Sequence, residues 1–264
     1  MTTLVPRHDL DGLGTTAAPN LFVIPAYNEE QNLPRLFSDL EANPDLFTPG
    51  SRLIIVDDGS GDGTVEVMRA YRGWLPLEPV VMPRNGGPGA AFRAGFAEAL
   101  RHATPDALVV TLEADTTSDL GALPLMLRRA ELGADLVLAS VHGGGKMLGV
   151  SRTRRLLSRG AGFVARRTLG LDARTVSSFF RVYRASILQA AVDRYGDGLI
   201  RECGFACKAE LLAKLTALGA QVEEVPVDLD ASRRMGESKM PVFETMLAYW
   251  RLSARGVDGE PERS

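Results

Sequence analysis

The pattern that decides the fold is Leu53-Ile-Ile-Val-Asp-Asp-Gly-Ser-Gly-Asp-Gly-Thr64. Four apolar residues of strand length are followed by an acidic, glycine-containing loop, and a helical stretch begins at Thr64. The same order of strand, polar loop and helix is seen from Leu21 to Ala42. Strands that alternate with helices in this way predict an α/β fold, with a mostly parallel sheet and helices on both faces.

Further strands and helices are expected along the chain. In the first half, apolar runs predict strands at residues 21–24, 53–56, 80–82, 108–112 and 135–141 and helices at 29–42, 64–72, 89–101 and 119–132. In the second half we expect strands at 179–183 and 221–227 and helices at 151–169, which is basic and amphipathic, and 203–218. We expect one domain over residues 20–252, with flexible segments at 1–19 and 253–264.

Length and composition fit a globular protein. The chain has 264 residues, of which 45% are hydrophobic and 24% charged, which excludes a disordered, fibrous or disulfide-stapled protein. Cys203 and Cys207 lack the spacing of a zinc site or a redox pair, so we expect reduced, partly buried packing residues. The apolar runs are too short to span a bilayer, and no signal-peptide core is present, so we expect a cytoplasmic protein.

Charge is unevenly distributed. The net charge of −3 argues against general nucleic-acid binding. Residues 151–184 nevertheless contain nine arginines and one acid, so this segment carries +8 and the rest of the chain −11. Such a segment suits a phosphorylated ligand or an anionic membrane surface, and a solvated helix face is the alternative.

Polar loops follow the expected strands, where ligands bind in open parallel sheets. They contain Tyr27 and Glu29 after the first strand, Asp57 after the second, and Asn85 in a glycine-rich turn after the third. Exposed amides of that turn could cradle an anion or a ribose, although its spacing is not that of a P-loop or a dinucleotide-binding motif. Each loop alone is also compatible with an ordinary helix entry.

The loop after the fourth strand is the most specific. The apolar run 108–112 leads directly into Glu113-Ala-Asp115, and alternate residues of an extended segment present both carboxylates to one side. Carboxylate oxygens suit Mg²⁺ or Mn²⁺ on a nucleotide diphosphate. An acidic pair that binds no metal is the alternative.

Together these loops resemble a known family. Residues 23–29 (Val-Ile-Pro-Ala-Tyr-Asn-Glu), 55–60 (Ile-Val-Asp-Asp-Gly-Ser) and 113–115 are similar to the nucleotide-sugar half of the family 2 inverting glycosyltransferases. Residues 158–161, 177–184, 224–226 and 233–239 resemble dolichol-phosphate mannose synthases and their bacterial polyprenyl-phosphate counterparts. The resemblance covers residues from about 20 to 250 and implies the glycosyltransferase-A fold, with a Rossmann-like, mostly parallel sheet.

The resemblance implies transfer of mannose from GDP-mannose to a polyprenyl or dolichyl phosphate, with inversion and with Mg²⁺ or Mn²⁺ as cofactor. By position, the base and ribose of the nucleotide would be held by Pro25, Tyr27, Glu29 and Asp57, with Asn85 as a further nucleotide-binding residue. Asp115 would bind the metal with Glu113 nearby, and phosphate charge would be neutralised by Arg233 and Lys239. The candidates for the acceptor phosphate are Ser158, Arg159 and Arg181.

The sequence also departs from the family. The usual Asp-x-Asp is Glu113-Ala-Asp115 here, which lengthens one carboxylate by a methylene, and Thr117 stands where a residue that assists the metal is often Gln. His142 follows a strand where an arginine is common. These differences leave three alternatives open: a UDP-sugar donor, a soluble acceptor, or a sugar-nucleotide-binding protein without transferase activity.

The apolar and aromatic residues between Val242 and Leu252 have near-helical spacing. They would either dock on a bilayer or close the core as a packed helix. Docking would place the protein at the periphery of the membrane, on its cytoplasmic face, where a lipid phosphate acceptor is available.

Overall fold

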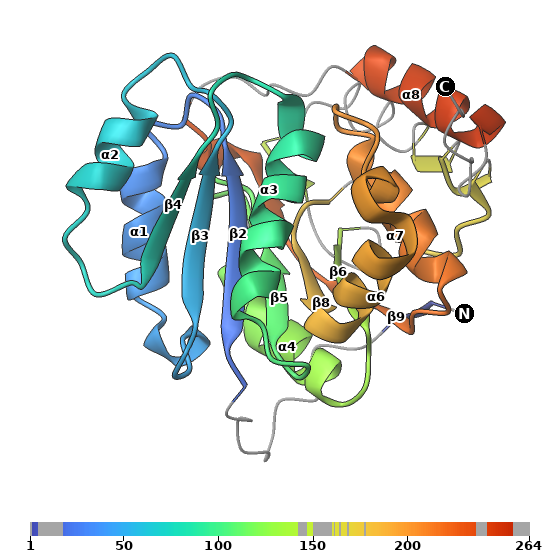
Figure 1. Cartoon of the computed structure of the whole chain (residues 1–264), viewed down its shortest axis with the longest axis horizontal. Helices are drawn as coiled ribbons and strands as arrows, with labels where there is room; N and C mark the ends of the chain where they lie inside the picture. The colour runs from blue at the N-terminus through green and yellow to red at the C-terminus, as the bar shows by residue number, and fades with distance from the viewer. Residues whose placement is uncertain are drawn as a thin grey trace.

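The computed structural model describes residues 2–4, 18–141, 147–149, 160, 162–163, 165–167, 169–176, 178–235 and 242–255. Within them, an eight-stranded sheet runs through the molecule in the order β1-β9-β6-β8-β5-β2-β3-β4 (Figure 1). Its strands are β1 (Thr3–Leu4), β2 (Asn20–Ala26), β3 (Arg52–Asp57), β4 (Leu77–Val81), β5 (Leu108–Thr111), β6 (Leu136–Ser140), β8 (Arg181–Arg184) and β9 (Val222–Pro226). Only β8 runs antiparallel to its neighbours, β5 and β6, so the mostly parallel sheet is confirmed.

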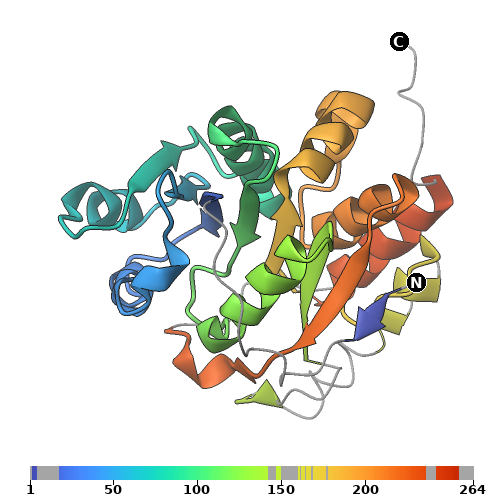
Figure 2. The ribbon, with the colours of Figure 1, turned by 90° about the horizontal axis from the view of Figure 1, so that it is seen from below.

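Helices cover both faces of this sheet, in three layers that Figures 1 and 2 show from two directions. One face carries α3 (Gly87–His102), α6 (Ala185–Tyr195) and α7 (Cys207–Ala217). The other face carries α1 (Leu33–Glu41), α2 (Thr64–Ala70) and α4 (Leu123–Glu131). A further helix, α8 (Val242–Arg255), lies above the sheet in Figure 1, near the carboxyl ends of the central strands.

The central strands are continuously apolar because helices pack on both of their faces. Leu21 and Val23 of β2 point into the core beneath α3, whereas Phe22 and Ile24 point into the core beneath α1 and α4. All four side chains are fully buried. At about 1.5–3 kcal/mol for each large apolar side chain that is buried, this strand alone contributes several kcal/mol to folding.

Element boundaries differ from expectation mainly where proline intervenes. The first helix begins at Leu33 rather than residue 29, with Pro34 in its first turn. The helix expected at 119–132 is a 3₁₀ turn, Leu120–Ala122, followed by α4, which again has proline in its first turn. α6 was not expected, because it follows β8 directly, without the turn or capping signal that marks the start of a helix.

Three expectations about the ends and the second half need correction or stay open. Thr3–Leu4 pair with Glu223 and Glu224 of β9, so these residues belong to the sheet and not to a flexible extension. α8 extends to Arg255, three residues beyond the expected domain end. Of the expected helix 151–169, the described residues between 160 and 169 are helical, and residues 151–159 lie outside the described parts.

A small parallel pair, β7 (Met147–Leu148) with β10 (Leu229–Asp230), lies outside the main sheet. Cys207 is buried as expected, whereas Cys203 is exposed, and both thiols are free. Among the described residues, no helix combines the length and hydropathy needed to cross a bilayer.

Candidate functional site

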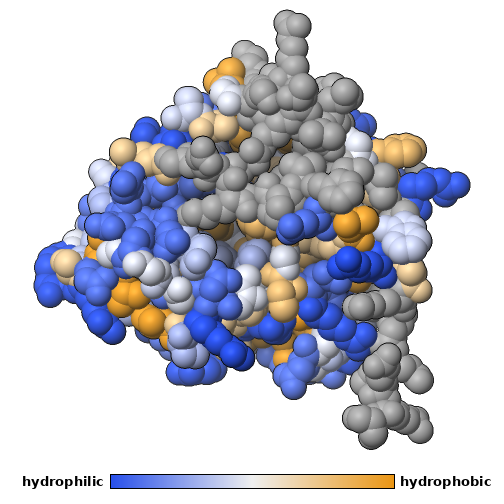
Figure 3. Space-filling view, turned by 90° about the horizontal axis from the view of Figure 1, so that it is seen from above, coloured by the Kyte–Doolittle hydropathy of each residue, from blue (hydrophilic) through white to orange (hydrophobic). Residues whose placement is uncertain are grey.

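A cavity of about 640 Å³ opens at the carboxyl ends of the strands, on the side that Figure 3 views from above. The loops that follow β2, β5 and β9, the start of α7 and one face of α8 contribute to its wall. Residues far apart in sequence therefore meet in one space, as the rule for parallel sheets predicts. The polar and aromatic residues that line it include Tyr27, Glu29, Asn32, Asp58, Asn85, Glu113, Asp115, Thr117, Phe179, Phe205, Lys208 and Arg234.

Asp115 is the central acid of this cavity. Its Oδ1 accepts hydrogen bonds from Thr117 N at 3.2 Å and Thr117 Oγ1 at 2.7 Å. Its Oδ2 accepts one from Arg234 Nε at 2.5 Å, and the same guanidinium forms an ion pair with it. Asp115 is 9% exposed, so it is a largely desolvated carboxylate with one oxygen held by its own loop and the other by a cation.

Two strained residues lie in the loops at this edge. Among the described residues, Asn28 (φ 52°) and Thr116 (φ 61°) are the non-glycine residues with positive φ. Asparagine tolerates this conformation, but a β-branched threonine is an outlier that costs on the order of 1–3 kcal/mol. Strain of this kind collects at functional sites, and here it sets the turn that directs Asp115 and Thr117 into the cavity.

Glu113 also lines the cavity, but its carboxylate is already bonded within the protein. Oε1 accepts a hydrogen bond from Phe179 N at 3.1 Å, and Oε2 accepts one from the Ser118 hydroxyl. Burial raises the pKa of Glu113, and the nearby charge of Asp115 raises it further. Glu113 therefore ties the end of β5 to the segment that enters β8, while Asp115 is the better placed of the two to meet a ligand.

The residues expected to hold a nucleotide are largely brought together. Pro25, Tyr27, Glu29 and Asn85 line the cavity. Asp57 is not among the lining residues, because its carboxylate is buried and accepts a hydrogen bond from Ser60 N at 3.3 Å. This bond shapes the loop after β3.

Asp58, which sequence reasoning did not single out, lines the cavity instead of its neighbour. Its Oδ1 accepts a hydrogen bond from Gly86 N at 2.8 Å and so joins the loop after β3 to the glycine-rich turn. Desolvation raises the pKa of Asp58 despite this bond. The two adjacent acids, Asp57 and Asp58, were the feature of the sequence that could have indicated this. Successive side chains at the end of a strand point in opposite directions, so only one of the two carboxylates can face the cavity.

The glycine-rich turn serves close packing as much as ligand binding. Gly89 N donates a hydrogen bond to Cys203 O at 2.8 Å, so this amide is not available to an anion. A Cβ on Gly89 would lie 2.0 Å from Glu202 O, and Gly87 has a φ of +79°. The turn thus needs glycine so that α3 can approach the segment before α7.

The two adjacent arginines after β10 differ in direction. Arg233, expected to contact phosphates, instead donates through Nη2 to Asp39 Oδ2 of α1 at 2.5 Å, and it does not line the cavity. Arg234 does line the cavity and pairs with Asp115. The Arg-Arg pair in the sequence marked the correct segment, but only the backbone direction selects which guanidinium enters the site.

Arg181 does not lie where an acceptor phosphate could meet it. It is 1% exposed, and its guanidinium donates to three main-chain carbonyl oxygens, those of Ser178, Val176 and Lys208, at 2.9 Å each. This placement removes Arg181 from the acceptor candidates and gives it a structural role. The other expected residues Ser158, Arg159 and Lys239, together with His142, lie outside the described residues.

Lys208 is a cation of the cavity wall that the sequence did not reveal. Its Nζ lies 3.8 Å from the centre of the Phe179 ring and 5.3 Å from that of Phe205. Burial lowers the pKa of Lys208 to about 8, although the charges of Cys207 and Glu113 oppose this shift. Phe179, Phe205 and Lys208 line the part of the cavity near β8, whereas Tyr27 lines the part near β2, two strands further along the sheet.

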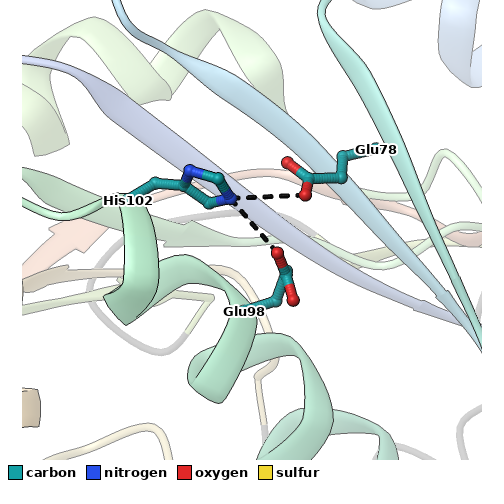
Figure 4. Close-up of side chains that lie close together, drawn as sticks. All are labelled: Glu78, Glu98 and His102. Atoms are coloured by element: carbon teal, nitrogen blue, oxygen red, sulfur yellow. Dashed lines mark hydrogen bonds and ion pairs between the residues drawn. The ribbon is translucent and has the colours of Figure 1, made fainter.

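A second charged cluster lies away from this cavity, between β4 and α3 (Figure 4). His102 Nε2 lies 3.1 Å from Glu98 Oε1 and 3.3 Å from Glu78 Oε1, a grouping with the donor types of a metal site. Arg101 also pairs with Glu98 at 2.9 Å. Because the cluster contains its own counter-ions, it is explained as an ion-pair network that joins the edge strand to α3.

The donor set in the cavity fits a divalent cation. Asp115 offers a carboxylate oxygen, with the Thr117 hydroxyl and the Glu113 carboxylate close by. Hard oxygen donors of this type bind Mg²⁺ and Mn²⁺ and leave coordination positions for water or phosphate oxygens. Asp115 would be the direct ligand, and Glu113 would support the loop that carries it.

Comparisons with known proteins found a matching family and relatives over most of the chain. The model of the family described as glycosyl transferase family 2 matches residues 21–191. A polyprenol monophosphomannose synthase of Mycolicibacterium smegmatis is 29% identical over 251 residues, which cover 92% of this chain and 89% of the relative. An undecaprenyl-phosphate mannosyltransferase of Micrococcus luteus is 31% identical over 242 residues, which cover 89% of this chain and 95% of the relative.

Solved structures show the same fold. The crystal structure of glucosyl-3-phosphoglycerate synthase from Mycobacterium tuberculosis with Mn²⁺, UDP and glucosyl-3-phosphoglycerate aligns with a TM-score of 0.67 at 18% identity, over 99% of this chain and 89% of that one. The same enzyme with Mg²⁺ and UDP aligns with a TM-score of 0.65 at 19% identity, over 99% and 88%. At such identities the likeness concerns the fold.

Proposed function

Because the chain belongs to glycosyl transferase family 2 and has the glycosyltransferase-A fold, we propose that it transfers mannose from GDP-mannose to a polyprenyl or dolichyl phosphate. The observation that carries this proposal is the single cavity in which Asp115 and Arg234 lie at the same sheet edge as Pro25, Tyr27 and Glu29. A nucleotide and its diphosphate can occupy that edge together.

The donor end of the cavity supports nucleotide binding. Tyr27 and Pro25 offer apolar surface for a base, and the Glu29 carboxylate and the Asn85 amide offer hydrogen-bond partners for base or ribose. Asp57 would contribute indirectly, because its carboxylate accepts a hydrogen bond from Ser60 N and so holds the loop after β3 in place. These assignments follow from the resemblance to the family, and the placement of these residues around one cavity supports them.

Asp115 would hold Mg²⁺ or Mn²⁺ at the diphosphate. The bound ion would supply charge neutralisation for the nucleoside diphosphate that leaves. Arg234 lies beside Asp115 and takes the role that the sequence suggested for Arg233, since it is the arginine that lines the cavity. Lys239, which follows it by five residues, remains a second candidate for phosphate neutralisation.

The acceptor needs no strong general base. A phosphomonoester with a second pKa near ~6 is largely dianionic at neutral pH, so its oxygen can attack the anomeric carbon directly. The new bond forms from the phosphate oxygen to that carbon as the bond to the donor diphosphate breaks, and attack from the opposite face inverts the centre. Ser158 and Arg159 are the acceptor-phosphate candidates that remain, and Lys208 adds a cation to the wall.

The proposal of membrane contact rests on α8, in which one side of the helix is buried and the other carries exposed apolar residues. Tyr249 and Leu252 are buried and Thr245 lines the cavity, whereas Leu247 and Trp250 are 40% and 64% exposed on the opposite side. Exposed tryptophan and leucine on an amphipathic helix suit a membrane interface. We therefore place the acceptor's lipid tail on the α8 side of the cavity, with the protein peripheral to the cytoplasmic face of the membrane.

The test is a transfer assay with radiolabelled GDP-mannose or UDP-glucose, a polyprenyl phosphate, and Mg²⁺, Mn²⁺ or chelator. We expect metal-dependent label in the organic phase from GDP-mannose, and its loss in Asp115→Ala. Asp106→Asn is the matched control, because Asp106 is exposed at the opposite end of β5. If only UDP-glucose gives labelled lipid, the donor is UDP-glucose and not GDP-mannose. If the protein binds nucleotide but labels no lipid, the acceptor is soluble or the protein binds sugar nucleotides without transferring the sugar.

A further inference from the structure

The segment that carries Arg234 is attached to α1 through Asn32. The Oδ1 of Asn32 accepts a hydrogen bond from Met235 N at 3.0 Å, and its Nδ2 donates to Met235 O at 3.1 Å. The same Nδ2 donates to Glu29 Oε2 at 2.7 Å. With 3% exposure, Asn32 is a buried amide that pairs with both main-chain groups of one residue, as a neighbouring strand would.

Arg233 provides a second attachment on the other side of Arg234. Its guanidinium pairs with Asp39 of α1 at 2.5 Å, and its carbonyl oxygen accepts from Arg35 Nη1 and Thr116 Oγ1 at 3.5 Å each. Both neighbours of Arg234 are therefore held by α1 or by the loop of Asp115. The backbone of Arg234 has little freedom to move while these contacts last.

Arg234 blocks the oxygen of Asp115 that a metal would use. Thr117 occupies Oδ1 through its amide and hydroxyl, so Oδ2 is the oxygen left for a cation, and Arg234 Nε lies 2.5 Å from it. A divalent cation and the guanidinium cannot both take this lone-pair position at bonding distance. The two cations must compete for Asp115.

We propose that Arg234 is an exchangeable counter-ion of Asp115, displaced when a divalent cation binds, and that Asn32 is the positioning residue that holds Arg234 there. This inference rests on the proposed function, because it assigns the competing cation to the same site. It goes further in naming a residue outside the metal site that controls metal affinity. Once displaced, the guanidinium stays beside the cavity, where a diphosphate would be its new partner.

The test measures Mn²⁺ binding by electron paramagnetic resonance, without nucleotide or acceptor. We expect Arg234→Gln to tighten Mn²⁺ binding about tenfold or more, the equivalent of one charge-assisted hydrogen bond. Asn32→Ala should tighten it in the same direction although Asn32 does not contact Asp115. Because Asn32 acts through Arg234, the double variant should bind Mn²⁺ no more tightly than Arg234→Gln alone.

Matched variants keep the result interpretable. Gln189→Ala removes an exposed amide on α6, bonded to Asp193 at 2.8 Å, and should leave Mn²⁺ affinity unchanged. Asp39→Asn weakens the Arg233 attachment without touching the core and should tighten binding by a smaller factor, which provides a second route if Asn32→Ala folds poorly.

The proposal is overturned if Asn32→Ala and Asp39→Asn leave Mn²⁺ affinity at the wild-type value, if the Asn32 and Arg234 effects add, or if no variant binds Mn²⁺. These outcomes do not depend on sugar transfer. If the variants change Mn²⁺ affinity as expected but the transfer assay gives no labelled lipid, Arg234 is still the counter-ion of Asp115, and the proposed lipid acceptor is wrong. If lipid is labelled but the variants leave Mn²⁺ affinity unchanged, the proposed acceptor is supported and the counter-ion proposal is wrong.

Discussion

The carboxylate of Glu113 accepts a hydrogen bond from the main-chain N–H of Phe179 at 3.1 Å, across 66 residues of sequence. The other oxygen of the same carboxylate accepts from Ser118, so one half-buried side chain joins two segments of the cavity wall. The extra methylene of glutamate, which departs from the family's usual aspartate, gives this carboxylate its reach. Glu113 is therefore adapted to its neighbours in this chain.

Restoring the family residue should consequently reduce activity. In Glu113→Asp the carboxylate retracts by a methylene and cannot keep both hydrogen bonds, and a displacement of about 1 Å in a catalytic loop can cost on the order of 10²-fold in rate. We expect a loss of this order in kcat with the Tm lowered by a few degrees. A gain in activity, measured in the transfer assay, would contradict the structural role of Glu113.

Asp115→Asn should abolish metal-dependent transfer while the fold is retained. The amide keeps the size of the side chain but loses the charge that attracts a divalent cation, and we expect kcat to fall at least about 10³-fold. Circular dichroism and thermal unfolding monitor the fold. Full turnover in this variant would remove Asp115 from the site.

Stability depends strongly on the buried ion pair between Glu210 and Lys214 of α7, whose charged atoms are 2.5 Å apart. Glu210 also accepts hydrogen bonds from Arg201 N and Glu202 N at 2.9 and 2.8 Å, and so it fixes the segment packed against α3. Glu210→Ala removes the carboxylate that neutralises the buried Lys214 ammonium, which then faces neutral acceptors such as the carbonyl oxygens of Gly198 and Leu199. The substitution should lower the free energy of unfolding by about 3–5 kcal/mol.

The matched control is Glu131→Gln, which removes a less buried ion pair with Arg128 on α4. Its cost should remain within about 1 kcal/mol. Equal decreases of the denaturation midpoint in the two variants would show that burial of the Glu210–Lys214 pair has no special weight.

The two thiols should react very differently. Cys203 is exposed, whereas burial raises the pKa of Cys207 to about 12. At pH 8 we expect a thiol reagent to modify one cysteine in the native protein and two after denaturation, because the thiolate is the reactive form. Fast modification of both thiols in the native protein would contradict this.

Cys207 also gives a pH dependence of stability. Between the ordinary thiol pKa of 9.0 and about 12, the unfolded chain has lost this proton while the native protein keeps it. The native state then binds more protons than the unfolded state, so this contribution to stability falls as pH rises. Cys207→Ala should remove that decrease, which urea unfolding at pH 8 and pH 10.5 would measure.

Membrane docking can be tested through α8. Trp250→Ser and Leu247→Ser should weaken binding to anionic vesicles by roughly tenfold when combined, because exposed apolar area is lost, and they should leave the core unchanged. Vesicle co-sedimentation measures this, and Tm is the control for folding. Unchanged sedimentation would favour α8 as a packed helix only.

The apolar pattern of the sequence predicts the mostly parallel sheet, most of its helices and the edge at which the site lies, but it did not predict α6 or β1. Runs such as Leu21–Ile24 and Leu53–Val56 are apolar at every position because both faces of a parallel strand are buried, and this local pattern is visible without coordinates. The loop with Tyr27 and Glu29 follows the run 21–24, and the acids Glu113 and Asp115 follow the similar run 108–112, so their meeting at one edge was predictable.

Which side chain of each polar pair enters the cavity depends on contacts between segments that are far apart in the sequence. Asp58 rather than Asp57 and Arg234 rather than Arg233 line it, since backbone direction at a strand or loop end is set by long-range hydrogen bonds such as those of Asn32 with Met235. Arg181 donates to the carbonyl oxygen of Lys208, 27 residues away, and Lys208 itself reaches the cavity from α7. These contacts join segments up to about two hundred residues apart, and no local pattern encodes such a separation.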